Sequence, residues 1–312
     1  MTELTAAVLD SDLATVESSG AGWVRTDIDW SGVERQRGTF DWHDVDRVVA
    51  AADAHGLRVL GMLAYTPDWA RSPGTNDKTP PNDPGDFARF AGAAAARYAG
   101  SAMTAWEIWN EPNIAPFWQP RPDAAAYGRL LTAAASAIRS ADANATVVSG
   151  GFAPAIDAAD GSEQAPETFL AELLASGNGD AFDALGTHPY SYPALPTDET
   201  TSAWNSFYRL PRLHDALERA GVHGRDIWLT EVGAPTGRSS AAVSEQRQAT
   251  ILVDALHAAR SLPYVKRTFL YTVRDRADDP ANPEANFGLR HHDTTPKTGW
   301  ADVVDAISNK RR

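Results

Sequence analysis

The chain of 312 residues contains no cysteine. This absence excludes disulfide bonds, metal sites with thiolate ligands and cysteine nucleophiles, and it leaves the redox compartment open. Basic residues are also in the minority, because 28 lysines and arginines stand against 41 aspartates and glutamates, a formal net charge of −13. An acidic surface of this kind argues against nucleic acids and anionic membranes as partners.

Long apolar runs are absent as well. No stretch approaches the ~20 consecutive apolar residues that a membrane-spanning helix requires, so we expect no membrane span. Residues 1–4 (MTEL) lack both the basic start and the long apolar region of a signal peptide. An extracellular or cell-envelope location is therefore expected only if a signal has been removed from this sequence. The compartment and the oligomeric state stay open.

The chain does contain enough apolar material for one sizeable core, with 43% hydrophobic and 22% charged residues. A length of 312 residues suits a single (β/α)8 barrel, which typically takes ~250 residues before insertions. We find no linker, internal repeat or low-complexity segment. We therefore predict one domain over residues 1–312.

One stretch organises the rest of the chain. Residues 106–113 (WEIWNEPN) indicate a buried strand that stops abruptly, because tryptophan and isoleucine favour strands and Pro112 removes a backbone donor. An amide and a carboxylate, Asn110 and Glu111, stand at the end of this strand. Aromatic faces stack on sugar rings and carboxyl groups move protons, so the pattern suits a carbohydrate site. The simpler alternative is an ordinary strand end with a solvated glutamate.

A second stretch has the same pattern. Residues 226–233 (DIWLTEVG) indicate an apolar strand that ends in Glu231 and a glycine, 120 positions after Glu111. Two such strands can place two carboxyl groups across one cavity, as glycoside hydrolysis requires. One carboxyl protonates the leaving oxygen, and the other attacks the anomeric carbon or activates a water. For each glutamate the alternative is a structural salt bridge.

Strand and helix patterns alternate along the chain, which predicts a parallel sheet covered by helices. Helix-to-strand connections are short and most strand-to-helix loops are long, and in a (β/α)8 barrel the long loops build the active site. Strands are predicted at 23–30, 57–65, 106–111, 146–149, 182–187, around 227 and at 265–273. Helices are predicted at 10–20, 43–55, 86–98, 124–140, 166–175, 209–220, 245–260 and 300–308.

The WNEPN run at 109–113 and the TEVG run at 230–233 resemble the clan A glycoside hydrolases, (β/α)8 barrels with a glutamate after strands four and seven. The surrounding residues look most like family 39, which contains β-xylosidases, α-L-iduronidases and bacterial exopolysaccharide endoglycosidases. The likeness runs from about Trp23 to Trp300. It implies a catalytic barrel that hydrolyses an oligo- or polysaccharide with retention, by double displacement through a covalent glycosyl-enzyme intermediate, without cofactor or metal.

The strand count, however, is one short of this resemblance. If Glu111 ends the fourth strand, the first strand has to lie within residues 1–9, a stretch with little alternation. We expect either a short, irregular first strand there or a barrel that is incomplete at this edge.

The resemblance also implies roles for individual residues. Glu111 would be the general acid/base and Glu231 the nucleophile, with their carboxyl groups ~5–5.5 Å apart. Asn110 would hold the sugar hydroxyl next to the anomeric carbon. Strand parity turns Arg25 into the lumen, where it would lower the pKa of the nucleophile or, alternatively, pair with the deeper Glu107.

His188 and Tyr190 lie two positions apart at a predicted strand end, so both can face the mouth of the barrel. By resemblance Tyr190 would hydrogen-bond the nucleophile, with His188 nearby. No ligand-spaced cluster accompanies this histidine, so no metal site is predicted. Tyr271 stands on the last strand where much of the clan has a tryptophan under the sugar. Further candidates for stacking on the sugar, each of which could equally be a packing residue, are Trp69, Trp109, Trp118 and Trp204.

Three alternatives remain. An exo-acting, β-xylosidase-type glycosidase would use the same residues inside a pocket in place of a cleft. A non-catalytic carbohydrate-binding barrel would need aromatic residues but not two opposed carboxylates, so Glu111 and Glu231 argue against it. A metal-dependent barrel enzyme would require a His/Asp ligand cluster, which the sequence does not present.

Overall fold

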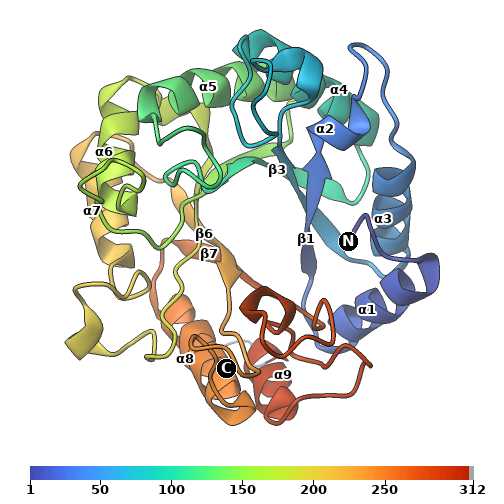
Figure 1. Cartoon of the computed structure of the whole chain (residues 1–312), viewed down its shortest axis with the longest axis vertical. Coiled ribbons are helices and arrows are strands. Elements are labelled where there is room, and N and C mark those ends of the chain that lie inside the picture. Colours follow the sequence, from blue (N-terminus) through green and yellow to red (C-terminus); the bar gives the residue numbers. More distant parts are fainter. Residues whose placement is uncertain (309–312) are drawn as a thin grey trace.

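The computed structural model describes residues 1–308, and its centre is a sheet of seven parallel strands. Strands that are consecutive in the chain are neighbours in the sheet, which curls around a central axis (Figure 1). The strands are β1 Trp23–Asp29, β2 Arg58–Ala64, β3 Met103–Asn110, β4 Thr146–Gly151, β5 Ala184–Thr187, β6 Asp226–Val232 and β7 Val265–Leu270.

Helices surround the strands and form the rim of the molecule (Figure 1). They alternate with the strands, which confirms the predicted (β/α)8 barrel class. The long helices of the described chain are α1 Ala6–Ser18, α3 His43–Ala54, α4 Pro84–Tyr98, α5 Ala124–Ala141, α6 Pro166–Ala175, α7 Leu210–Arg219, α8 Glu245–Ser261 and α9 Trp300–Ser308, and α2 Trp30–Val33 is a single turn. None of the helices described is long and apolar enough to span a membrane.

Local sequence accounts for where several helices begin. The side chains of Asp83, Asp123 and Ser244 each accept a hydrogen bond from a backbone amide in the first turn of α4, α5 and α8. A side-chain oxygen at this position satisfies an amide that has no partner inside the helix. These caps end the strand-to-helix loops at defined points, and the loops form the walls around the carboxyl ends of the strands.

The apolar core has two parts. The larger part lies between sheet and helices and takes the outward residues of the strands, such as Val24 and Ile28 of β1. The smaller part fills the amino-terminal end of the lumen with one side chain from each strand: Trp23, Leu60, Ala105, Val148, Ala184, Trp228 and Phe269. Trp23 meets Trp228 edge-on, with ring centroids 5.5 Å apart. The lumen is therefore floored at this end, which leaves its carboxyl-terminal end for the site.

The amino-terminal segment differs from one of the two expectations for it. Residues 1–5 form turns and α1 begins at Ala6, so the short first strand expected within residues 1–9 is wrong for the described chain. The Thr5 side chain caps this helix by accepting from the Val8 amide at 3.5 Å. The other expectation is confirmed: β1 and β7 are the two ends of the sheet, and the barrel is open by one strand at this edge.

Candidate active site

The carboxyl end of β3 carries Asn110 and Glu111 into the mouth of the barrel. Trp109 and Glu111 have φ angles of 73° and 46°, in the left-handed region that residues other than glycine rarely adopt. The fully buried indole of Trp109 anchors this turn, because its Nε1 donates to the Phe117 carbonyl at 2.7 Å. Strained turns persist where the surrounding packing holds them, and they are concentrated at active sites.

Arg25 of β1 is the centre of a polar network in the lumen. Its Nε donates to Oε2 of Glu107 at 2.5 Å and its Nη1 to Oε1 of Glu231 at 2.7 Å. Its Nη2 donates to Oδ1 of Asn110 at 3.0 Å. The side chain of Glu107 is fully buried and also accepts from the Gly151 amide at 2.9 Å. Arg25 therefore binds both of the glutamates proposed as its partners, the deep one and the one at the mouth.

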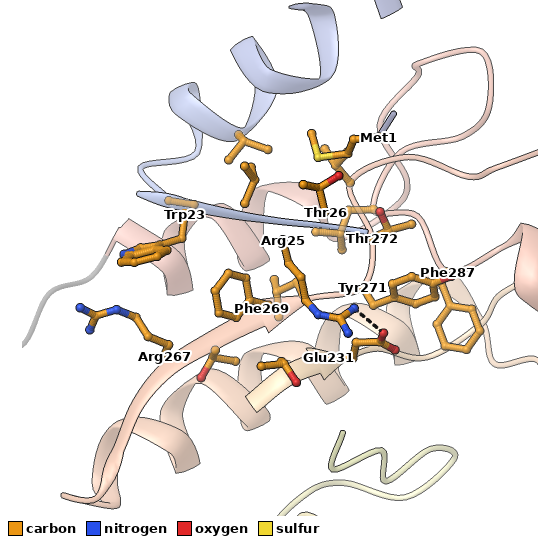
Figure 2. A pocket seen from close by; sticks show the side chains of 18 of the residues that line it. Met1, Trp23, Arg25, Thr26, Glu231, Arg267, Phe269, Tyr271, Thr272 and Phe287 are labelled. Carbon is orange, nitrogen blue, oxygen red and sulfur yellow. Dashed lines mark hydrogen bonds and ion pairs between the residues drawn. The ribbon is translucent and has the colours of Figure 1, made fainter. Parts of the chain in front are cut away.

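Glu231, near the end of β6, is held as a carboxylate. Its Oε2 accepts a hydrogen bond from the Tyr190 hydroxyl at 2.6 Å, and its other oxygen faces Arg25 (Figure 2). Burial alone would raise the pKa of Glu231. The charges of His188 and Arg25 and the hydrogen bonds from Tyr190 and Arg25 outweigh burial, so that the pKa lies below its ordinary value. An ionised carboxylate is the form that a nucleophile needs.

Glu111 faces Glu231 across the mouth. Its Oε1 lies 2.8 Å from Nδ1 of His188, which is 3.7 Å from Oε2 of Glu231. Burial lowers the pKa of His188, but the two carboxylates outweigh burial and raise it above its ordinary value. The ring also fills the space beside Gly151, where a Cβ would lie 2.1 Å from Nε2 of His188. His188 is thus fixed between the two glutamates.

Three of these groups are close enough to hold a metal ion. Ligand atoms of Glu111, His188 and Glu231 lie within 4.8 Å of one another, the one such group found in residues 1–308. The Arg25 guanidinium, which binds Glu231, repels a cation at that oxygen, and the Tyr190 hydroxyl takes the other oxygen. The donor set therefore fits a pair of reacting carboxyl groups better than a metal centre.

Tyr271 follows β7 and reaches the mouth, where its ring lies against Phe287 with centroids 5.2 Å apart (Figure 2). Arg276 donates to the Tyr271 hydroxyl at 3.4 Å. Burial and the nearby charge of Glu231 raise the pKa of Tyr271 to about 12, so that the phenol is neutral. The structure therefore places the Tyr271 ring at the mouth of the barrel, in the cavity that Glu231 also lines.

The tryptophans expected to stack on the sugar are packed elsewhere. Trp118 is 2% exposed and meets the fully buried Trp109 edge-on in the core. Trp69 meets Trp30 edge-on and donates from its Nε1 to a backbone carbonyl, outside the mouth. Trp204 is 43% exposed but does not line the mouth either. In this structure the loops turn the indoles of Trp118 and Trp69 inward, so both take the packing role that was the alternative to stacking.

Other aromatic residues line the mouth in their place. Tyr65, Tyr192 and Phe287 all border the same cavity as Glu111 and Glu231, and none of these three is among the predicted site residues. Tyr192 continues the two-residue alternation of His188 and Tyr190, and this pattern could have identified it. Phe287 comes from the long polar loop after β7, in which no periodic pattern marks it.

Barrels with a glutamate after the fourth and the seventh strand make up clan A of the glycoside hydrolases. Since the described sheet lacks the first of the eight strands, the glutamates after β3 and within the end of β6 hold those two positions in this chain. A family model is more specific. Residues 5–265 match the model of the cellulases (glycosyl hydrolase family 5), and the chain belongs to this family. The clan-level prediction is confirmed.

Solved structures with the same fold include members of glycoside hydrolase family 39 and of family 5. A family 39 glycoside hydrolase from Bacteroides cellulosilyticus is 23% identical, with a TM-score of 0.76 over 96% of this chain and 61% of its own. A monomeric β-xylosidase from Caulobacter crescentus is 24% identical, with a TM-score of 0.71 over 96% of this chain and 65% of its own. A GH5_18 protein from Streptomyces cattleya, solved with Manβ1-4GlcNAc, is 20% identical, with a TM-score of 0.72 over 99% of this chain and 76% of its own.

These likenesses concern the fold. The chain spans less than two thirds of the length of the family 39 enzyme and of the β-xylosidase. A search of curated proteins finds no match to the sequence.

Proposed function

We propose that the protein is a retaining O-glycoside hydrolase that cleaves an oligo- or polysaccharide. The observation that carries the proposal is the approach of the Glu111 and Glu231 carboxylate oxygens to within 4.8 Å. Retaining enzymes hold their two carboxyl groups ~5–5.5 Å apart, whereas inverting enzymes need ~6.5–9.5 Å to admit a water. An approach of single oxygens to within 4.8 Å suits the shorter of these two separations, and with it direct attack on the sugar by one carboxylate.

In the first step, the ionised Glu231 forms a bond to the anomeric carbon as the bond to the leaving oxygen breaks. The proton of Glu111 passes to that oxygen. In the second step, Glu111 takes a proton from water, the water oxygen bonds to the anomeric carbon, and Glu231 leaves as a carboxylate. Tyr190 and Arg25 orient Glu231 throughout, and His188 orients Glu111 through its Nδ1.

The Arg25 network also gives Asn110 a defined orientation. Because Oδ1 of Asn110 accepts from Arg25, its amide nitrogen is left to donate to the hydroxyl next to the anomeric carbon. A hydrogen bond to that hydroxyl tightens as charge develops on the sugar ring. Arg25 therefore orients both the nucleophile Glu231 and Asn110, which would bind the reacting sugar.

The mouth suits a neutral sugar with several rings. Tyr65, Phe117 and Tyr192 offer aromatic faces around the two glutamates, and Tyr271 lies against Phe287 beside Glu231. We infer an endo-acting or oligosaccharide-active enzyme, with exo-acting β-xylosidase activity as the alternative. The named structures, a β-xylosidase and a protein holding Manβ1-4GlcNAc, make β-xylosides and β-mannosides the first compounds to try.

The test is hydrolysis of aryl glycosides and polysaccharides by the wild type, Glu111→Ala and Glu231→Ala, with the exposed Glu199→Ala as matched control. We expect the control to behave as the wild type and both site variants to fail. Azide should yield a glycosyl azide of retained configuration with Glu111→Ala alone, because azide attacks the glycosyl-enzyme in place of water and needs no general base. If both site variants cleave as well as the control, the assignment is wrong. Sugar binding without turnover by the wild type would instead indicate a binding barrel.

A further inference from the structure

Phe287 lies at the centre of an aromatic cluster at the mouth, although it comes from the long loop after β7. Between ring centroids, it is 5.8 Å from Tyr190, 5.9 Å from Tyr192 and 5.2 Å from Tyr271. Tyr190 and Tyr192 also meet each other edge-on, with centroids 5.8 Å apart. Tyr190, Tyr192 and Phe287 therefore form a triangle of edge-on contacts, in which each ring limits the tilt of the other two.

The position of Tyr190 depends on these ring contacts. β5 ends at Thr187, so Tyr190 lies beyond the sheet, and its amide donates to the carbonyl of His188 only two residues before it, at 2.9 Å. Its hydroxyl nevertheless donates to Oε2 of Glu231 at 2.6 Å. A hydrogen bond weakens steeply as its geometry departs from linear. The rings that hold the phenol in place therefore also hold this hydrogen bond.

The backbone around Phe287 is itself fixed by buried polar side chains. The carbonyl of Asn286 accepts from Nζ of Lys297 at 3.1 Å, and the carbonyl of Phe287 accepts from Nε2 of Gln248 at 3.2 Å. Lys297 also donates to Oδ1 of Asp275 at 2.8 Å, and both of these side chains are buried. Buried charges and amides are costly to leave without partners, so this network ties the loop firmly to α8.

The strand that carries Glu231 leaves room for the Phe287 ring. A Cβ at Gly233, two residues after Glu231, would lie 2.9 Å from Cδ1 of Phe287 and 2.5 Å from the carbonyl oxygen of Tyr271 (Figure 2). Phe287 thus packs on the backbone directly after β6 as well as on Tyr190. One ring contacts both the segment that carries the hydrogen-bond acceptor and the side chain that donates to it.

We propose that Phe287 is a positioning residue that holds the Tyr190 hydroxyl on Glu231. The proposal rests on the nucleophilic role proposed above for Glu231. Phe287 has no polar side-chain atom, so it acts on the carboxylate through the position of Tyr190. The other groups that face Glu231 come from several elements and are not substituted in the test: Arg25, His188, Glu111, Tyr271 and Glu284.

The test is a double-mutant cycle between Phe287→Met and Tyr190→Phe. Methionine fills a space similar to that of phenylalanine but has no flat ring. The readouts are the pKa of Glu231, from a carbon-13 NMR titration of its carboxyl group assigned with Glu231→Gln, and the pH profile of kcat/KM. The control is Phe207→Met, because Phe207 and Phe287 are both 3% exposed and Phe207 does not line the mouth.

We expect Phe287→Met to raise the pKa of Glu231 by at least about 0.5 and to lower kcat/KM about tenfold, because the hydrogen bond from Tyr190 weakens. In the Tyr190→Phe background the same substitution should leave this pKa unchanged, since the hydroxyl is already absent. Phe207→Met should lower Tm by an amount similar to that of Phe287→Met and leave both readouts as in the wild type.

The proposal is overturned if Phe287→Met changes the pKa of Glu231 equally in both backgrounds, because the ring then acts by excluding water and not through Tyr190. It is also overturned if KM rises while the pKa stays constant, because the ring then only binds the sugar. Should Phe287→Met fail to fold, Phe287→Leu takes its place in the cycle. A wild type that hydrolyses no glycoside would refute the proposed function alone, since the NMR titration needs no turnover.

Discussion

Replacement of Arg25 by methionine separates the structural from the chemical role of the arginine network. The substitution removes the three hydrogen bonds to Glu107, Glu231 and Asn110. The carboxylate of Glu107 is fully buried, so it is left without its counter-charge. Breaking one partner out of a buried pair typically costs about 3–5 kcal/mol, and we expect a loss of that order in the free energy of unfolding.

A second substitution should restore part of the stability but not the activity. In Arg25→Met/Glu107→Leu both buried charges are gone, and a buried pair replaced by apolar residues of similar size is often as stable as the original. We expect the free energy of unfolding, measured in urea, to recover only part of the loss, because the Gly151 amide that donated to Glu107 is left without its acceptor. Both variants should keep kcat/KM depressed by at least about tenfold, because Glu231 and Asn110 still lack the guanidinium.

The direction in which the pH dependence of kcat/KM shifts is the decisive test of this reasoning. His188 and Arg25 outweigh burial and hold the pKa of Glu231 below its ordinary value, and a carboxylate that acts as the proposed nucleophile must be ionised. Removal of Arg25 raises this pKa, so the acid limb of kcat/KM should move to higher pH in the single and in the double variant alike. The reasoning is refuted if the double variant is no more stable than the single one, or if the acid limb stays where it is in the wild type.

Three further outcomes are expected. Tyr190→Phe removes the 2.6 Å hydrogen bond to Glu231, so kcat/KM should fall about 10- to 100-fold and the acid limb should move to higher pH at unchanged Tm; an unmoved limb would contradict the role given to the hydroxyl. Gly151→Ala places a methyl group 2.1 Å from Nε2 of His188. We expect the free energy of unfolding, measured in urea, to fall by about 1–3 kcal/mol and kcat to fall as well. If neither changes, the His188 ring can move aside and is not fixed by this contact. Trp118→Ala should lower the free energy of unfolding by about 3–5 kcal/mol in the same measurement, because the indole is buried. KM should stay unchanged at temperatures well below the unfolding transition. A large rise in KM would indicate that Trp118 stacks on the sugar after all.

Regular elements could be predicted from the sequence because local signals define them. The helix at 166–175 and the helix at 300–308 have the predicted bounds, and β1 begins at Trp23 as its alternation indicates. The contact between Arg25 and Glu107 could be predicted from the sequence for the same reason. Arg25 and Glu107 have inward parity on strands that the pattern identifies, and the structure brings them together.

Loop residues could not be predicted in this way. Whether the indole of Trp118 faces a sugar or the core depends on how the Pro-rich loop after β3 folds back on Trp109, a tertiary contact without a periodic signal. Phe287 reaches the mouth from the long loop after β7, and its nearest aromatic partner, Tyr271, stands at the start of that same loop, far away in sequence. A tryptophan near a strand end therefore predicts a loop rich in aromatic residues, but it does not predict which of their rings lines the cavity.

The left-handed turn at the end of β3 has a consequence for protein engineering. Trp109 and Glu111 hold conformations that work against folding, and the packing of the indole keeps them in place. Substitutions selected there for thermal robustness would relax this turn and let the carboxyl group of Glu111, the proposed acid/base, move away from His188. Libraries aimed at heat tolerance should leave this segment untouched and seek their gains on the outer helices, where a higher melting point need not be traded against turnover.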